Sequence, residues 1–463
     1  EVERALALTE KLRSGIGNAD LRARFVGALQ HLFLMQLALT IYTGHSESTW
    51  ADALQINERR RARVLREQLA LGLFEASSYT FDPVKRSKYH SLQAALTTKL
   101  FNQNEILPKS DAVKSSELAE EIAQIRIGLL ALDAEIASDN EQWESIVTAS
   151  DLDLVSIQSK LGPNSIAIDF AVSPRATHAF FITDKHIVHR ALKAVDTEDV
   201  VATRSVLKQV FQVAADSFPS KNTLIVVPDA SVYQVQLASI LLDDQSHLVD
   251  RYSLTLTPSL SLLGDPSTVL PVDATLALVG EPVFQNGQYL ASATWTGDPL
   301  DHVMRGQDLG KLSPLPYSGV EIDGVVAVAG DRQMTVLRGF EASKKNIMGG
   351  ALSERDIVHF ATHGFVNAEA PDLSGLVMSL VNYDGESIDG FISVTDVYSM
   401  QGVGATLVVL SGCRTALGAR VTGEGPMSLA RAFMQLGVNY VIASQWDVPD
   451  RATAELMVHF YKE

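Results

Sequence analysis

A thiol and an imidazole occupy matching places in the second half of the chain, each directly after a short apolar run. Cys413, the only cysteine among 463 residues, follows ATLVVLSG, and His363, 50 residues earlier, ends DIVHFATH. An imidazole beside a thiol can take its proton, which produces a strong nucleophile, and can later protonate a leaving amine. Ligands of an open α/β sheet gather at the carboxyl ends of its strands. The two residues therefore predict a cysteine nucleophile and a histidine base at neighbouring strand ends.

Glycines flank both residues. Gly364 follows the histidine and Gly412 precedes the cysteine. Glycine lets a backbone turn sharply at a strand end and lets a substrate peptide approach closely. The backbone N–H groups of Gly364 and Cys413 are the expected donors to an oxyanion. No carboxylate stands out beside His363, so we expect a dyad rather than a triad.

Two simpler interpretations compete with catalysis. A lone cysteine in an apolar strand usually packs in the core, but Cys413 is followed by RTALG instead of more apolar residues. His359 shares the strand with His363 and, by alternation, its face, which is also the arrangement of a metal-binding pair. A third ligand is not evident, and His359 lies deeper in the apolar run, so a core histidine is the better interpretation. We expect no metal and no other cofactor.

The composition limits the classes of partner. The chain has 38 basic and 55 acidic residues, a formal net charge of −17, which argues against direct binding to nucleic acid. No apolar run approaches the roughly 20 residues that cross a bilayer, so no membrane association is expected. One cysteine cannot form an internal disulfide, which favours a reducing compartment such as the cytoplasm. Because the sequence begins at Glu1 without a signal-peptide pattern, we interpret it as a fragment of a longer chain.

Residues 1–150 have the composition and spacing of helices. The segment 50–76 is rich in Ala, Leu, Arg and Glu. Further along, six apolar residues recur at steps of four and three, which places them on one stripe of a helix. They are Leu118, Ile122, Ile125, Leu129, Leu132 and Ile136. Paired helices of this composition fit the end of a helical repeat array.

From about residue 150 onward, short apolar runs alternate with helix-like segments. The runs include SIAIDFAV, HAFFITDKHIVHRAL, NTLIVVPD, TLALVGEP, DIVHFATHGF, TLVVLSGC and NYVIASQWDV. This pattern predicts parallel sheets covered on both faces. The runs fall into two groups, at 165–265 and 274–463. We therefore predict a helical region at 1–150 followed by α/β parts at 151–273 and 274–463.

Several ordered motifs, more specific together than any one His-Gly pair, run through the α/β part. They are LIVVPDASVYQVQLASILL, LTPSLSLL, DIVHFATHGFVN, LVVLSGCRTALG and the segment from GEGPMSLARAF to HFYKE. Over roughly 165–463 they resemble the CHAT family of caspase-like cysteine peptidases, which commonly follow tetratricopeptide repeats. That family is related to separase, whose LWDVTD-type segment is similar to QWDVPD at 445–450. The generic caspase signature also has its histidine about 50 residues before the cysteine.

The resemblance implies an α/β fold, a caspase-like parallel-sheet sandwich in two halves, preceded by an all-α segment. The half at 151–273 would be degenerate, and the half at 274–463 would be active. His363 and Cys413 match the family's catalytic dyad. The segment 371–395 would form the loop and turn after the histidine. Residues 417–425 would form an activation loop beside the cleft, and that loop contains Gly418, Gly423, Glu424 and Gly425.

Two features depart from the family pattern. Position 414 is Arg414, where an acidic residue is common, so the charge beside the nucleophile differs. The chain also stops at HFYKE, where family members continue through a last helix and strand, which indicates truncation at the C-terminus.

Acidic residues after the last apolar run indicate a basic substrate preference. By resemblance, Asp450 and Asp447 lie near the pocket for the residue before the scissile bond, where a carboxylate would select Arg or Lys. Ser411, two residues before the nucleophile, would line the same pocket without a charge. In the alternative interpretation, Asp450 is only the N-cap of the following helix.

Two functional hypotheses follow. The first is an endopeptidase that cleaves a protein substrate and is controlled by a protein regulator at the helical region or by ordering of the activation loop. The second is a non-catalytic scaffold, a pseudo-peptidase that only binds a protein partner. Retention of His363 and Cys413 with their flanking glycines favours the enzyme. A nucleotide-binding domain is disfavoured, because VVPDAS and LVGEPV lack the glycines of a phosphate loop.

Overall fold

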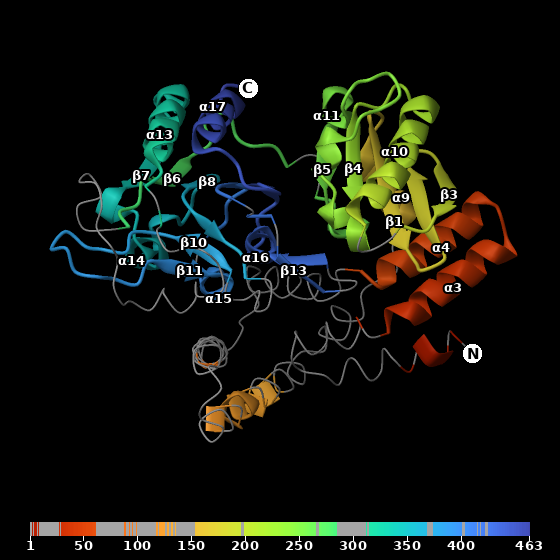
Figure 1. The fold of residues 1–463 in the computed structure, drawn as a ribbon, viewed down its shortest axis with the longest axis horizontal. Coiled ribbons are helices and arrows are strands. Elements are labelled where there is room, and N and C mark those ends of the chain that lie inside the picture. Colours follow the sequence, from red (N-terminus) through yellow and green to blue (C-terminus); the bar gives the residue numbers. More distant parts are fainter. Residues whose placement is uncertain are drawn as a thin grey trace. The chain divides into compact units, whose positions relative to one another are not determined.

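A computed structural model describes most of the α/β part and a pair of helices near the N-terminus (Figure 1). The described residues are 29–61, 153–195, 199–264, 268–284, 314–367, 374–400, 403–413 and 425–463, with 415, 416, 418–421 and separate positions before 29, between 88 and 135, and at 312. The chain divides into two compact units. The first comprises Glu1–Ala70, Ala137–Val269 and Arg420–Gly425, and the second comprises the remainder. The three-part division at 150 and 273 stays a prediction beside this clustering.

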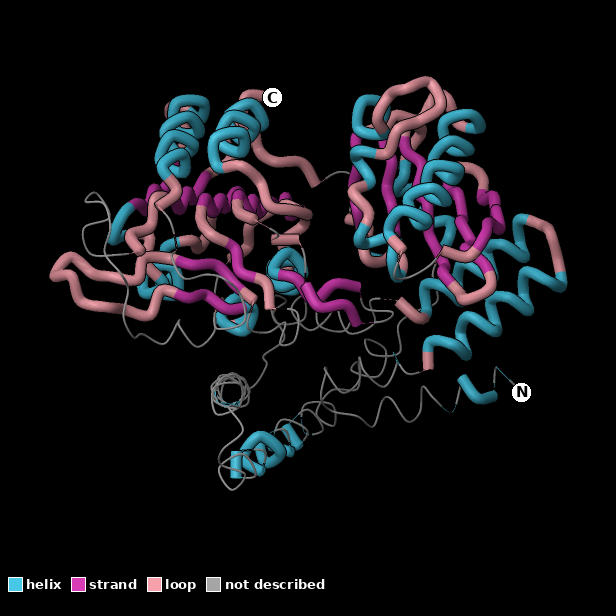
Figure 2. The backbone as a smooth tube through the Cα atoms, viewed as in Figure 1, coloured by secondary structure: helices cyan, strands magenta, loops and turns pink. Residues whose placement is uncertain are grey.

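The first unit contains a five-stranded mixed sheet with the order β3-β2-β1-β4-β5. The strands of both sheets are drawn in magenta in Figure 2. Its strands are β1 (Ser165–Val172), β2 (Ala176–Ile182), β3 (Ile187–Lys193), β4 (Thr223–Val227) and β5 (Ser253–Leu256). β1, β4 and β5 are parallel, whereas β2 is antiparallel to both β1 and β3. The expectation of a purely parallel sheet is therefore wrong for this unit. The run HAFFITDKHIVHRAL is a hairpin, which needs only a short turn between strands, and here Thr183 N–H donates to the His186 carbonyl at 2.9 Å.

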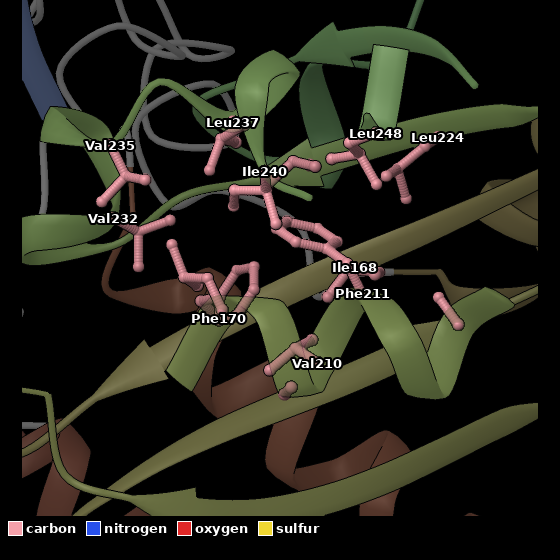
Figure 3. Packing of buried hydrophobic residues seen from close by; sticks show 14 of the residues in the cluster. Ile168, Phe170, Val210, Phe211, Leu224, Val232, Val235, Leu237, Ile240 and Leu248 are labelled. Carbon is pink, nitrogen blue, oxygen red and sulfur yellow. The ribbon is translucent and has the colours of Figure 1, made fainter. Parts of the chain in front are cut away.

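Helices cover both faces of this sheet because the strand residues alternate between two cores. One core contains Ile168 and Phe170 of β1 and packs against Val210 and Phe211 of α10 (Val200–Ser217), as Figure 3 shows. The other core contains the intervening β1 residues and packs against α3 (Gln30–Thr43), α4 (Glu47–Arg59) and α9 (Leu154–Leu161). α10 begins where it does because the Asp199 carboxylate accepts hydrogen bonds from two free N–H groups of the first turn. The predicted N-terminal helices are confirmed in α3 and α4.

The apolar stripe predicted for 118–136 is partly described. Leu118, Ile122, Ile125 and Leu132 are helical, and the first, second and fourth of these are buried. Leu129 and Ile136 lie outside the described residues.

The second unit contains a five-stranded sheet that is parallel throughout, with the order β15-β12-β8-β6-β7. Its strands are β6 (Leu276–Gly280), β7 (Met334–Arg338), β8 (Ile357–Ala361), β12 (Leu407–Ser411) and β15 (Tyr440–Ala443). β6, β8 and β12 are buried along their whole length. This confirms the parallel sheet predicted from the apolar runs, since strands buried on both faces need no alternation of apolar and polar residues.

Helices also cover both faces of the second sheet. α13 (Pro316–Ala329) and α17 (Asp450–Phe460) pack on one face with β-strand residues such as Ile357 and Val409. α15 (Val394–Tyr398) and α16 (Leu429–Gln435) pack on the other with residues such as Val358 and Phe360. A small antiparallel sheet follows β8 and consists of β9 (Gly364–Phe365), β10 (Gly375–Val377) and β11 (Phe391–Ser393). No helix among the described residues has the length and apolarity to cross a membrane.

The two sheets share one strand arrangement. In the first unit the first strand, β1, lies between β2 and β4, and β5 lies beyond β4. In the second unit β6 lies between β7 and β8, and β12 lies beyond β8. β4 thus corresponds in position to β8, and β5 to β12. Two differences remain outside these shared positions. β2 is antiparallel to β1 whereas β7 is parallel to β6, and the fifth strand lies at opposite edges, β3 beyond β2 and β15 beyond β12.

Candidate active site

The pairing of β8 with β12 brings His363 and Cys413 to the same level of the sheet. In this parallel ladder Ala361 is the register partner of Ser411, an offset of 50 residues that is constant along both strands. His363 and Cys413 each lie two positions beyond the last paired residue. The 50 residues that separate His363 from Cys413 in the sequence therefore equal the register offset of the two strands. The two residues follow the ends of adjacent strands, side by side.

Both side chains are half-buried at this edge. The Cys413 thiol donates a hydrogen bond to the carbonyl oxygen of Val448, with 3.7 Å between sulfur and oxygen. Val448 lies in the segment 444–449 that connects β15 to α17. The imidazole of His363 packs against the ring of Phe284, with 5.2 Å between ring centroids and 40° between the planes. The thiol is thus neither exposed on an open surface nor enclosed in the core.

The flanking glycines are required because the two strand ends approach each other closely. A Cβ atom on Gly412 would overlap the carbonyl oxygen of Thr362, and one on Gly364 would lie 2.7 Å from the carbonyl oxygen of Cys413. Neither glycine has a positive φ, so steric room and not backbone freedom explains them. The predicted oxyanion donors are the N–H groups of Gly364, at the start of β9, and of Cys413, in the turn after β12, and the two residues approach each other closely.

A pair of hydroxyl residues fixes the turn after the cysteine. Thr415 Oγ1 donates to the Leu410 carbonyl at 3.2 Å and accepts from the Ser444 N–H at 3.1 Å. Ser444 Oγ in turn donates to the Gly412 carbonyl. These bonds join the end of β12 to the end of β15. The sequence analysis missed both residues, and the only local signal was a hydroxyl side chain just beyond each apolar run.

Comparison with known proteins shows the family of this chain. The family model of the CHAT domain matches residues 199–463, which is more than half of the chain. The chain belongs to the CHAT domain family, in the caspase-like clan. Residues 165–198, where the sequence also resembled the family, lie outside the match. Tetratricopeptide repeat protein 28 of Homo sapiens is 25% identical over an alignment of 277 residues, and the match covers 51% of this chain and 10% of that protein. The chain therefore spans about a tenth of the length of this relative.

The three residues predicted for the substrate pocket of the CHAT domain have different surroundings. Ser411 is 8% exposed, and its Oγ has no hydrogen-bond partner among the described residues. Asp447 is exposed. Asp450 is half-buried, and its carboxylate accepts a hydrogen bond from the Tyr317 N–H at 2.9 Å.

Asp450 therefore caps a helix, but not the one that the sequence indicated. The N-cap of α17 is Pro449, whose side chain makes no capping bond, and Asp450 is the first residue of that helix. Tyr317 lies in the first turn of α13, where free N–H groups need acceptors. The interpretation of Asp450 as the N-cap of α17 is wrong. Its carboxylate instead ties α17 to the N-terminus of α13.

The predicted activation loop of the CHAT domain is described in part. Gly418 begins β13 (Gly418–Val421) and Gly425 begins β14 (Gly425–Ser428), and the two strands pair as a two-stranded sheet. Gly423 and Glu424 lie outside the described residues, as does Arg414.

His359 lies in the core, in agreement with its interpretation as a core histidine. It is fully buried, with Nε2 2.9 Å from Glu321 Oε1 and Nδ1 3.2 Å from Tyr461 Oη. No cluster of three or more potential metal-binding side chains occurs in the described part of the chain. Glu321 and Tyr461 come from α13 and from the residue that follows α17, and neither was identified from the sequence.

Proposed function

We propose that this CHAT domain is a cysteine endopeptidase in which Cys413 is the nucleophile and His363 is the general base. The observation that supports it is the register of β8 and β12, which sets the two residues beside each other at the carboxyl edge of a parallel sheet. In the proposed reaction the imidazole takes the thiol proton, and the sulfur attacks the scissile carbonyl carbon. The N–H groups of Gly364 and Cys413 stabilise the oxyanion. The imidazole then gives its proton to the leaving amine, and water releases the acyl group.

The shared strand arrangement supports a two-halved caspase-like fold with one degenerate half. Asp229 lies two residues beyond β4, as His363 lies two residues beyond β8. Pro258 lies two residues beyond β5, as Cys413 lies two residues beyond β12. The first half thus carries a carboxylate and a proline where the second carries the imidazole and the thiol. In this proposal catalysis is confined to the second half.

The substrate is a protein, and the partner in regulation is a second protein that binds the helical region. The likeness to a tetratricopeptide repeat protein supports this role for the helices, because helical repeat arrays offer extended binding surfaces. A preference for Arg or Lys before the scissile bond would depend on Asp447, the exposed acid near the site. Ordering of 417–425 is the second proposed control, and no cofactor takes part.

Substitution of the two residues tests the proposal. Cys413→Ala and His363→Ala should each lower kcat/KM on a protein or peptide substrate by at least about a thousandfold, because members of one catalytic unit fail together. His459→Ala, at an exposed histidine of α17, is the matched control and should retain wild-type activity. Circular dichroism checks that all three variants fold. Wild-type turnover in Cys413→Ala or His363→Ala would overturn the assignment. If the wild-type protein cleaves no peptide even with its regulator bound, the result favours the non-catalytic scaffold.

A further inference from the structure

Three ionisable side chains meet in the core of the second unit, on the face of the sheet that α13 and α17 cover. His359 of β8 is fully buried, and Glu321 of α13 is 2% exposed. The His359 ring lies between the Glu321 carboxylate, at 2.9 Å from Nε2, and the Tyr461 hydroxyl, at 3.2 Å from Nδ1. Burial and the nearby Glu321 carboxylate raise the pKa of Tyr461, so its hydroxyl stays protonated. We call Glu321, His359 and Tyr461 the core cluster.

Among the residues that the structure describes, the neighbours recorded for the core cluster on the strands and helices are apolar. The register partners of His359 on the neighbouring strands are Leu278 of β6 and Val409 of β12. The same core contains Ile322 and Met457 from the two helices. Glu321 and Tyr461 are therefore the titratable groups that face His359 from the elements packed against it. Burying polar groups in such a place costs free energy that an apolar trio of similar volume would not cost.

The hydrogen bond between Tyr461 Oη and His359 Nδ1 adds a directionality that apolar contacts lack, and the Glu321 carboxylate lies beside Nε2 as an ion-pair contact without hydrogen-bond geometry. The cluster holds the C-terminal end of α17 to β8 and α13. The N-terminal end of α17 is held separately, by the bond between the Asp450 carboxylate and the Tyr317 N–H of α13. α17 is therefore anchored at both ends.

The anchored helix starts two residues after Val448, whose carbonyl oxygen accepts the hydrogen bond of the Cys413 thiol. The segment 444–449 runs between β15 and α17. Its first residue, Ser444, is bonded to the turn after Cys413. The position of the Val448 carbonyl relative to the sulfur is thus determined at one end by β15 and at the other by α17.

We propose that the core cluster is a positioning device that, through α17, holds the Val448 carbonyl against the Cys413 thiol and so keeps the thiol in a resting, hydrogen-bonded state. In this state the thiol proton points to a carbonyl oxygen and not to a base. Movement of α17 would withdraw this acceptor and release the sulfur toward a base. The proposal rests on the proposed function only in treating Cys413 as the nucleophile.

The single cysteine makes the test specific, because any thiol label reports on Cys413 alone. The rate of alkylation by iodoacetamide is measured against pH for wild type, Tyr461→Phe and Glu321→Gln. Tyr461→Phe removes one hydroxyl and keeps the ring, so we expect the alkylation rate at pH 7 to rise three- to tenfold and the profile to move to lower pH. Tyr440→Phe, at an exposed tyrosine of β15, is the matched control and should behave as wild type. Glu321→Gln keeps the shape of the cluster and should shift the profile in the same direction.

The outcomes separate this proposal from the proposed function. A lower melting temperature with an unchanged alkylation profile in Tyr461→Phe and Glu321→Gln would show that the cluster is only structural and would overturn the inference. If Tyr461→Phe does not fold, the Glu321→Gln profile decides in the same way. His363→Ala is measured beside them. An unchanged profile in His363→Ala would count against the dyad, whatever the core-cluster variants do.

Discussion

The carboxyl edges of the two sheets have opposite characters. At the edge of the second sheet, His363 and Cys413 are half-buried and each is followed or preceded by a glycine. At the corresponding edge of the first sheet, Asp229 is buried and paired with Arg60, the residue that follows α4. The same strand arrangement thus supports an accessible edge in one unit and a sealed edge in the other. What differs is a helix that the first unit places over its strand ends.

α4 and the residue after it seal both positions of the first edge. The Arg60 guanidinium pairs with the Asp229 carboxylate at 2.5 Å, beyond β4. Glu58 accepts hydrogen bonds from Ser259 Oγ and from the Leu260 N–H, directly beyond Pro258. In the second unit these two places belong to the histidine and the cysteine. A strand edge that would accommodate a ligand is therefore filled by side chains of the same chain.

Two buried aspartates beside Arg60 and Arg61 have pKa values shifted in opposite directions. Burial alone raises the pKa of Asp229, but the neighbouring Arg60 and Arg61 outweigh it and hold that pKa below its ordinary value. For Asp169, which lies 3.0 Å from Arg61, burial outweighs the arginine and raises the pKa well above its ordinary value. Asp229 is therefore the charged anchor of the sealed edge.

The largest expected effect comes from removing that anchor. Asp229→Ala leaves the buried Arg60 guanidinium unpaired and removes the acceptor of the Val172 N–H. Loss of one partner of a buried pair costs about 3–5 kcal/mol. We therefore expect the free energy of unfolding of the first unit, measured by urea denaturation, to decrease by that amount. Asp243→Ala removes an exposed partner of Lys208 and should cost less than about 1 kcal/mol. Hydrogen exchange of the β1 amides reports on the first unit, and equal effects of the two substitutions would refute a sealing role for Asp229.

A second effect concerns a pair of buried histidines in the first sheet and its response to acid. His178 of β2 and His189 of β3 share a hydrogen bond of 3.0 Å, and both are 9% exposed. Burial chiefly, together with positive charge at His178, Arg190 and His45, lowers the pKa of His189 to about 4. Burial likewise lowers the pKa of His178.

The sign of the effect follows from proton binding. Between pH 6.5 and pH 4 the unfolded chain binds the His189 proton and the folded chain does not, so the free energy of unfolding decreases as the pH falls through this window. At pH 4 the loss is roughly 2–3 kcal/mol. Asp169 acts in the opposite direction, because its raised pKa makes the folded state bind a proton first. Urea unfolding at several pH values in wild type and His189→Gln isolates the histidine, and parallel pH profiles for the two proteins would contradict the prediction.

The sequence predicted the accessible edge much better than the sealed one. Cys413 and His363 follow uninterrupted apolar runs, and in a parallel sheet such runs locate both the strands and their ends. Arg60 stands in NERRRARVL, which has the local pattern of a solvated helix end, and only its pairing with a residue 169 positions away buries it. Long-range hydrogen bonds likewise join Asp450 to Tyr317 and Ser444 to Thr415. Such bonds produce no periodic pattern in the sequence, so the sequence could not predict them. The β2–β3 hairpin was missed because its two strands and the short turn between them form one strand-like stretch of the sequence.

The smallest expected effect concerns the acids beside the accessible edge. Asp450→Asn keeps an oxygen acceptor for the Tyr317 N–H and removes only a charge near the N-terminus of α13, which is worth about 0.3–1 kcal/mol. Because that carboxylate is occupied by a helix end, the preference between peptides ending in Arg and in Asp should stay unchanged. Asp447→Asn is the matched substitution at an exposed acid, and it should weaken cleavage after Arg if a carboxylate selects basic residues. Loss of the preference for Arg in Asp450→Asn, at unchanged stability, would instead place Asp450 in the substrate pocket. An aspartate would then bind a guanidinium at both edges, that of a substrate arginine in the second unit and that of Arg60 in the first.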